Sequence, residues 1–326
     1  MTAVLAGLGG CVPPRVVGNA EIAPQLDTTD DWIRTRTGVS QRHWIEPGMS
    51  TVGLAAEAGA RALKSAGLSK VGAVVLATTT PDRPCPASAP EVAARLGLPH
   101  VAAFDLGAVC AGFVYGLAAG AGLISAGVAR DVLVIGADTF STIIDPTDRS
   151  TAMIFGDGAG AVVLRAGEPD EPGAIGPFDL GSDGDLAELV MIPAGGSRRR
   201  VGDDPREHFF TMQGKPTFRH AVRRMESSAR AVLAEAGWRT EDVDWVVAHQ
   251  ANRRIIDALG GALDLPAERL VSNIDRVGNT VAASIPLALA DAADRIRPGE
   301  KVLLTSFGGG LAWGSTALRW PTITAA

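Results

Sequence analysis

Short, continuous apolar runs recur along the chain, and two of them follow helix-like segments that stop at a glycine. Residues 61–67 precede the run 71–77, and residues 230–237 precede the run 243–248. Runs without polar alternation are typical of strands that are buried on both faces. The pattern therefore predicts an α/β protein with largely parallel sheets that helices cover on both sides.

The two halves of the chain share this pattern. The helix, glycine and strand that end at Ala77 parallel those that end at Ala248, and the run 131–136 parallels 301–306. Such units are common in any α/β protein, but two matches at a similar offset favour duplication. The Gly-, Pro- and acid-rich stretch 167–177 marks the boundary. We expect halves at residues 1–168 and 174–326, with a polar surface excursion at 181–204.

Composition and charge exclude several classes of protein. The 326 residues are 46% hydrophobic, which allows a large core, and the net charge of −6 argues against nucleic-acid binding. The low-charge stretch 113–128 is too short and glycine-rich to cross a membrane, and the N-terminus lacks the positive segment of a signal peptide. Cys11, Cys85 and Cys110 have no metal or disulfide spacing. We therefore expect a cytoplasmic protein without a metal.

One cysteine, Cys110, lies where a strand-like run meets a predicted helix of small and apolar residues. The free N–H groups and the dipole of a helix start favour the thiolate and can stabilise an oxyanion. Four glycines inside this helix each cost about 1 kcal/mol, which indicates close packing against other backbone. They are Gly112, Gly116, Gly120 and Gly122. Taken alone, an inert buried cysteine is the commoner interpretation.

Two distant segments change that interpretation. His249 ends the apolar run that starts at Trp245, and Asn279 stands in a turn before another small-residue helix. Each has an ordinary structural explanation, as a hydrogen-bonded histidine or a turn asparagine. Together with Cys110 they form the combination of a nucleophile and two polar assistants.

The chain resembles the β-ketoacyl-acyl carrier protein synthase III family of the thiolase superfamily. The motifs that carry the resemblance run in the family's order along essentially the whole chain. They are Asp-Trp-Ile-Arg-Thr-Arg-Thr-Gly at 31–38, Cys-Ala-Gly-Phe at 110–113, Asp-Pro-Thr-Asp-Arg at 145–149, Phe-Gly-Asp-Gly-Ala-Gly at 155–160, His-Gln-Ala-Asn at 249–252, Gly-Asn-Thr at 278–280 and Phe-Gly-Gly-Gly at 307–310. The resemblance implies a thiolase-like fold, in which two duplicated halves form five layers, α-β-α-β-α.

The resemblance also implies an acyltransferase that condenses two thioesters. Cys110 would take an acyl group from acyl-CoA, with the backbone N–H groups of Cys110 and Gly309 as oxyanion hole. His249 and Asn279 would then donate hydrogen bonds to malonyl-acyl carrier protein as it loses CO₂. The condensation would initiate fatty-acid or polyketide chains, with no cofactor besides these thioester substrates.

Further residues match binding positions of the family. Thr28, Trp32, Arg36 and Arg149 would hold the coenzyme A nucleotide, and Arg219, Arg253 and Arg254 would contact the acidic carrier protein. The chain departs from the family's basic pattern at Gly260 and Gly261, which leaves the extent of the carrier surface open. Without the resemblance, Trp32 and the arginines are equally well explained as a capped surface helix and a solvated helix face.

The acyl pocket would involve Phe155 and, from the partner subunit of a homodimer, the loop that carries Cys85. A cysteine at that position predicts a pocket larger than acetyl requires, unless neighbouring residues refill the space. An alternative function transfers the acyl group to a hydroxyl or amine without forming a carbon–carbon bond. An inactive partner subunit is disfavoured because Cys110, His249 and Asn279 are all present, and the glycine-rich loop of plant-type polyketide synthases is absent.

Overall fold

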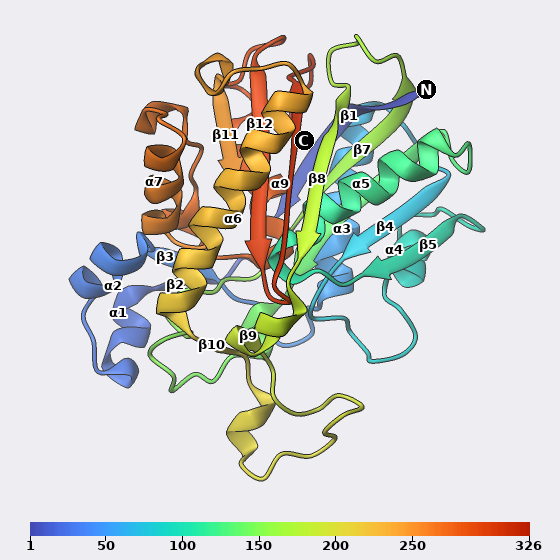
Figure 1. Ribbon diagram of the computed structural model, residues 1–326. Coiled ribbons are helices and arrows are strands. Elements are labelled where there is room, and N and C mark those ends of the chain that lie inside the picture. Colours follow the sequence, from blue (N-terminus) through green and yellow to red (C-terminus); the bar gives the residue numbers. More distant parts are fainter.

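Two β-sheets lie side by side in the computed structural model, which describes residues 1–326 (Figure 1). The first sheet has the strand order β1-β7-β6-β4-β5, and the second has the order β11-β12-β13-β8. The strands of the first sheet are β1 (Thr2–Cys11), β4 (Ala73–Ala77), β5 (Ala102–Leu106), β6 (Asp131–Asp138) and β7 (Gly158–Gly167). Those of the second are β8 (Ile175–Ser182), β11 (Trp245–Ala248), β12 (Lys301–Gly308) and β13 (Ala312–Arg319).

Helices fill three layers around these sheets. α5 (Gly112–Ser125) and α9 (Ser284–Ala292) contact strands of both sheets and lie between them. α3 (Thr51–Ala66) and α4 (Ala89–Arg95) cover the outer face of the first sheet, whereas α6 (Gly214–Glu235) covers the second and packs against α7 (Arg253–Ala262). The five-layered α-β-α-β-α arrangement that we expected is confirmed.

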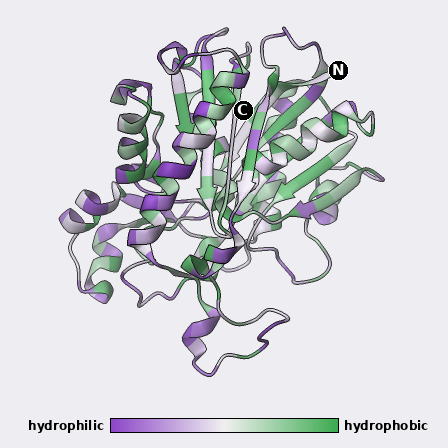
Figure 2. Ribbon diagram, in the orientation of Figure 1, coloured by the Kyte–Doolittle hydropathy of each residue, from purple (hydrophilic) through white to green (hydrophobic).

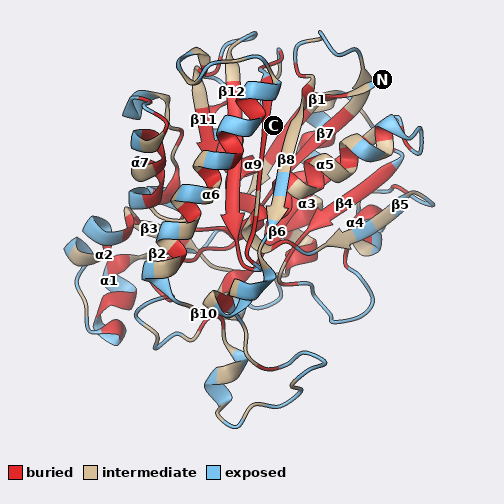
Figure 3. Cartoon of the chain, in the orientation of Figure 1, coloured by how far each residue is buried: buried red, intermediate tan, exposed pale blue.

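Burial explains the apolar runs. The residues of β4 and β6 are almost all buried, and Figures 2 and 3 show apolar, buried strands beneath helices whose outer faces are polar. α6 buries one stripe of residues spaced by about one turn, including Ala221, Met225 and Ala229. As predicted, α3 ends before Gly67 and α6 ends before Gly237. Both glycines have a left-handed backbone, with φ of 65° at Gly67 and 69° at Gly237.

The prediction of largely parallel sheets was wrong for four of the seven strand pairings in these two sheets. β4 pairs in parallel with β5 and β6, and β11 with β12, but β7 is antiparallel to β1 and β6, and β13 is antiparallel to β8 and β12. β12 passes to β13 through the short turn 309–311, which has no room for the crossover that a parallel neighbour requires. The apolar runs indicate that a strand is buried on both faces, but they do not indicate whether it runs parallel or antiparallel to its neighbours.

The two sheets repeat one topology. Matching β4 with β11, β6 with β12, β7 with β13 and β1 with β8 gives the same strand order, and the missing fifth strand of the second sheet is reduced to a bridge between Val246 and Leu270. β7 ends at Gly167 and β8 begins at Ile175. We keep the division at 1–168 and 174–326 as a proposal that this symmetry supports.

The glycines of α5 are explained in part. A Cβ on Gly116 or Gly120 would come within 3.0 Å of Val134 in the first sheet, and one on Gly112 within 3.0 Å of Ala77. Close packing therefore accounts for three of the four glycines. Gly122 is exposed and has open space around it, so packing does not explain that position.

Smaller elements surround the ends of the sheets. They are β2 (Val16–Gly18), α1 (Asn19–Ile22), α2 (Asp30–Thr37), β3 (Gln41–His43), β9 (Val190–Met191), β10 (Thr211–Met212) and α8 (Ile274–Val277). β9 and β10 pair at the base of the polar excursion, which projects from the body of the molecule in Figure 1. None of the helices is both long and apolar enough to span a membrane.

Candidate active site

Cys110, His249 and Asn279 line one pocket, although they come from distant parts of the chain. The pocket is largely apolar, since eleven of its 17 lining residues are hydrophobic. Cys110 precedes α5, His249 follows β11, and Asn279 lies shortly before α9. The two central helices therefore bring the cysteine of one half against the histidine and asparagine of the other.

Cys110 is held on a strained turn. It lies in the 3₁₀ turn Val109–Ala111, and Val109 has a φ of 47°, a conformation that costs a β-branched residue on the order of 1–3 kcal/mol. The turn Val281–Ala283 before α9 repeats this geometry, with a φ of 53° at Val281. Equivalent strained valines therefore stand beside the pocket in both halves of the protein.

Burial opposes the thiolate form that a helix start favours at Cys110. It raises the pKa of the thiol well above its ordinary value, and the negative charge of Asp138 raises it further. Cys110 lies two residues before Gly112, where α5 begins. These effects favour the thiol form in the free protein.

His249 is a buried, neutral imidazole. Its backbone N–H donates to Thr305 O at 2.9 Å, which extends the pairing of β11 with β12 to the edge of the pocket. The side chain is 2% exposed, and burial lowers its pKa to about 3. The ring Nδ1 lies 2.7 Å from Ser284 Oγ. The other ring nitrogen, Nε2, has no hydrogen-bond partner in the protein and is available to a substrate.

The protonation state of the imidazole follows from this burial. An exposed histidine is protonated below about pH 6.5, whereas His249 stays neutral down to about 3 because its folded-state pKa is lowered. The ring-nitrogen NMR shifts of His249 should therefore not titrate near pH 6.5. A His249 ring that gains a proton near that pH, in protein that remains folded, would contradict a neutral imidazole.

Asn279 is oriented by its own turn. Its backbone pairs with Ile154 O and Gly156 N at 2.9 Å each, and its side-chain Oδ1 accepts from the Val281 N–H at 2.9 Å. The amide oxygen is thereby engaged, and Nδ2 is left with only a long contact of 3.5 Å to Ala251 O. The side chain of Asn279 therefore presents its donor to the pocket.

A buried carboxyl, Asp138 at the end of β6, fastens this turn. One of its oxygens accepts from Thr79 N at 2.7 Å and from the hydroxyls of Thr78 and Thr80, and the other accepts from Ala282 N at 3.0 Å. Burial raises the pKa of Asp138 to about 7 against the opposing effect of these hydrogen bonds. Asp138 thus ties the Asn279 turn to the first sheet.

The glycine turn after β12 closes the pocket beside Cys110. A Cβ on Gly308 would lie 2.8 Å from both Cβ and N of Cys110, so only glycine allows this approach. Gly309 is buried and lines the pocket, and its backbone N–H has no partner in the protein. A buried, unpaired N–H beside a cysteine is the feature that an oxyanion hole requires.

A second, more open pocket adjoins the first and carries four cations. It shares Ile154, Met212, Thr217, Asn252 and Ile255 with the inner pocket. Its cationic residues, Arg36, Lys215, Arg219 and Arg254, are exposed and form no ion pair with the protein. The sequence assigns Arg36 to nucleotide binding and Arg219 and Arg254 to the carrier protein, but all three line this outer pocket. Lys215 also lines it and was not among the predicted residues.

Trp32 and two arginines gather at the edge of this region. The Arg149 guanidinium lies 4.2 Å from the centre of the Trp32 ring, and that of Arg36 lies 5.7 Å from it. The Thr28 hydroxyl is buried without a hydrogen-bond partner. The residues expected to hold a nucleotide therefore include an aromatic face, two cations and an unused polar group.

Five expected residues line neither the inner nor the outer pocket: Thr28, Trp32 and Arg149 at the edge just described, and also Arg253 and Cys85. Arg253, the first residue of α7, does not line the outer pocket. Its side chain forms an ion pair with Asp257 at 2.7 Å. Cys85 is exposed in the loop before α4 and does not line the inner pocket, whereas Phe155 does. A contribution of Cys85 to an acyl pocket requires a partner subunit.

The inner pocket has walls that sequence reasoning missed. Phe155 packs against Phe140 and Phe210 with ring centres 4.5 and 5.3 Å away, and Val190 and Met212 come from the paired strands β9 and β10. Phe210 and Met212 stand in a segment without a clear hydrophobic periodicity, so the sequence offered no signal that they meet in this pocket. Ser284, which contacts His249 outside the pocket, looks in the sequence like any other small residue of α9.

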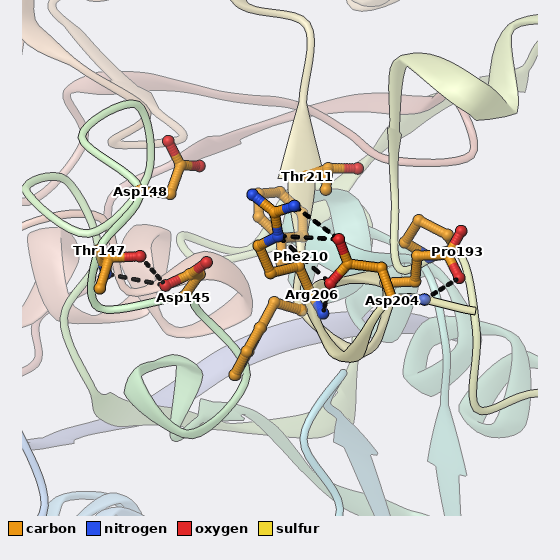
Figure 4. A pocket seen from close by; sticks show the side chains of 10 residues that line it. Asp145, Thr147, Asp148, Pro193, Asp204, Arg206, Phe210 and Thr211 are labelled. Carbon is orange, nitrogen blue, oxygen red and sulfur yellow. Dashed lines mark hydrogen bonds and ion pairs between the residues drawn. The ribbon is translucent and has the colours of Figure 1, made fainter. Parts of the chain in front are cut away.

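Another surface pocket lies between the 145–148 turn and the polar excursion (Figure 4). Its charged groups are already engaged, because Arg206 pairs with Asp204 at 2.6 Å and Asp145 accepts from Thr147 at 2.6 Å. The structure contains no group of three or more His, Cys, Asp or Glu side chains that could hold a metal ion. We assign no ligand to this pocket.

Comparison with protein-family models gives two matches. Residues 104–184 match the model described as 3-Oxoacyl-[acyl-carrier-protein (ACP)] synthase III, and residues 233–320 match the model of its C-terminal part. These segments contain Cys110, His249, Asn279 and Gly309.

Whole-length relatives agree with these models. The beta-ketoacyl-acyl carrier protein synthase III 3 of Streptomyces coelicolor is 59% identical over 98% of both chains. The crystal structure of 3-oxoacyl-(acyl carrier protein) synthase III from Pseudomonas aeruginosa superposes with a TM-score of 0.94 at 53% identity, covering 99% of this chain and 100% of that one. The priming β-ketosynthase of the R1128 polyketide pathway gives 0.90 at 35% identity, covering 98% and 96%.

Proposed function

This chain belongs to the 3-oxoacyl-acyl carrier protein synthase III family, and we propose that it condenses an acyl-CoA with malonyl-acyl carrier protein to initiate fatty-acid or polyketide chains. The observation that supports this proposal best is the convergence of Cys110, His249 and Asn279 in one largely apolar pocket beside the unpaired N–H of Gly309. The relatives named above are synthases of this type.

In the first half-reaction, the Cys110 sulfur attacks the thioester carbonyl of acyl-CoA. A carbon–sulfur bond to Cys110 forms, the bond to coenzyme A breaks, and the thiol proton leaves with the coenzyme A thiol. The N–H groups of Cys110 and Gly309 would donate to the carbonyl oxygen as it gains negative charge.

In the second half-reaction, malonyl carrier loses CO₂ and its electron pair forms an enolate. His249 and Asn279 would donate hydrogen bonds to the thioester oxygen that takes up this charge. The enolate carbon attacks the acyl-Cys110 thioester, which releases the thiolate and a β-ketoacyl carrier. A neutral histidine and an amide suit this step, because both donate without adding or losing a proton.

The outer pocket would receive both substrates. Trp32 with Arg36 and Arg149 offers stacking and charge to a nucleotide, and Thr28 offers a hydroxyl. The unpaired cations around Arg219 and Arg254 would attract the acidic carrier even though the whole chain is negative. Arg253 can contribute to the carrier surface only from outside this pocket.

Charge reversal in the outer pocket should weaken use of the carrier. We expect Arg219→Glu with Arg254→Glu to raise the KM for malonyl carrier about tenfold at low salt, and less at high salt, because long-range attraction is screened. The KM for acyl-CoA should change less. Arg297→Glu is the control, since Arg297 is exposed, forms no ion pair and lines neither pocket. Equal losses for both substrates would assign these arginines to a shared entrance.

A homodimer would complete the acyl pocket. β5 is the edge strand of the first sheet, and Phe104 on it is 37% exposed, so this edge can pair with a second copy. The loop with Cys85 would then reach the partner's pocket. We expect Cys85→Phe to shift preference toward acetyl-CoA without slowing acetylation. A wild-type enzyme that already strongly prefers acetyl-CoA over four-carbon and longer thioesters would contradict the larger pocket.

The test of the proposed function is product analysis. The wild-type protein with an acyl-CoA and malonyl carrier should give a β-ketoacyl carrier and one CO₂ for each product. Product from an acyl-CoA and a small alcohol or amine, with no malonyl donor present, would establish the transferase alternative instead.

A further inference from the structure

The inner nitrogen of His249 has one partner, the hydroxyl of Ser284. Nδ1 and Oγ lie 2.7 Å apart, and the two residues are 2% and 1% exposed. Ser284 is the first residue of α9, and its hydroxyl makes no other hydrogen bond. The direction of this one bond therefore decides which ring nitrogen of His249 carries the proton.

The two directions of this bond differ in where they leave an unpaired donor. If Nδ1 carried the proton, it would donate to Ser284, and the serine O–H would be buried without an acceptor, which costs roughly 1–3 kcal/mol. If the serine donates instead, the unpaired donor is the Nε2–H, which faces the pocket, where water or a substrate oxygen can accept it. The imidazole is neutral because burial lowers its pKa. The single ring proton is therefore placed on Nε2, the nitrogen that has no partner in the protein.

Ser284 belongs to the same short segment that orients Asn279. The Val281 N–H donates to the amide oxygen of Asn279, the Ala282 N–H donates to Asp138, and Ser284 follows two residues later. One segment, residues 279–284, therefore both carries one donor of the pocket and sets the direction of the other. No proton has to be transferred for either group to act as a donor.

We propose that Ser284 is a positioning residue that fixes the Nε2–H tautomer of His249, so that His249 acts as a hydrogen-bond donor in the decarboxylation of malonyl carrier. The inference rests on the proposed function for its kinetic consequence, but the position of the ring proton is a property of the protein alone. Without the serine hydroxyl, the two neutral tautomers are no longer separated, and part of the enzyme presents a lone pair to the enolate oxygen.

The kinetic test compares Ser284→Ala with Ser228→Ala. Ser228 is equally buried, but its hydroxyl bonds to Asp179 O and does not line the pocket. We expect Ser284→Ala to lower the kcat of CO₂ release by about 10- to 100-fold, the range found when the hydrogen-bond partner that orients a metal-bound histidine is removed. The KM for malonyl carrier should change less, Ser284→Thr should recover part of the rate, and Ser228→Ala should remain close to wild type.

The structural test is nitrogen NMR on protein labelled with ring-¹⁵N histidine, with the His249 signals assigned by their loss in His249→Asn. In the wild type, Nε2 should carry the proton and Nδ1 should not; in Ser284→Ala this difference should shrink. A wild-type proton on Nδ1, or CO₂ release by Ser284→Ala at the wild-type rate, would overturn the proposal. If Ser284→Ala does not fold, the wild-type spectrum still decides. A folded wild type that forms no β-ketoacyl product would instead refute the proposed function and leave the tautomer readable.

Discussion

Cys110→Ala should form no acyl adduct and no condensation product when it is incubated with acyl-CoA and malonyl carrier. Cys110 is the one cysteine that lines the inner pocket, and removing a nucleophile from a working site lowers turnover by roughly four orders of magnitude or more. Intact-protein mass spectrometry would detect the adduct on the wild type. Cys110→Ser should lose most of both signals, because its hydroxyl is a poorer nucleophile than a thiol.

The control for this experiment is Cys11→Ala. Cys11 is partly buried in β1, outside the inner pocket, and burial raises its pKa. Its replacement should leave the adduct intact. A full adduct on Cys110→Ala, or one that maps to Cys11 or Cys85, would show that the pocket around Cys110 is not where acylation occurs.

Asn279→Ala should retain acylation and lose decarboxylation. The Val281 N–H binds the Oδ1 of Asn279, so its Nδ2 is the atom that can donate to a substrate. Deletion of one oxyanion donor costs about 3–4 kcal/mol in the transition state. Release of labelled CO₂ should therefore fall by about 10²- to 10³-fold, whereas the acyl adduct from acyl-CoA forms at a rate close to that of the wild type.

Asn279→Asp separates the lost donor from the lost volume. Aspartate keeps an oxygen for the Val281 N–H but places a second acceptor where the amide donor was. We expect the same loss of CO₂ release as with alanine, again with acylation retained. If either variant releases CO₂ as the wild type does, Asn279 has no part in decarboxylation.

The three residues of the candidate site could be singled out because each borders an apolar segment. Cys110, His249 and Asn279 are polar or reactive residues at points where buried elements leave the core, so the sequence marks them individually. Their meeting in one pocket depends on the duplicated topology, which the repeated helix-glycine-strand pattern indicated. The strand directions could not be predicted in the same way, because a strand buried on both faces reads alike in either direction.

Properties that depend on packing were not visible in the sequence. The raised pKa of Cys110 results from burial and from Asp138, a residue that the sequence did not single out. Ser284 looks like any small residue of α9 until its hydroxyl is seen beside His249. The outer pocket joins cations from α2, α6 and α7, so the sequence could suggest separate basic patches but not their common surface.

The central claim is that Cys110 carries the acyl group between two half-reactions in one pocket. A chase experiment tests it most directly: wild-type enzyme is acylated with acyl-CoA, freed of excess thioester, and mixed with malonyl carrier. The account predicts that the adduct on Cys110 disappears at the rate at which CO₂ and β-ketoacyl carrier appear, in equal amounts. An adduct that persists while product accumulates, or that is lost by hydrolysis without CO₂ release, would contradict it.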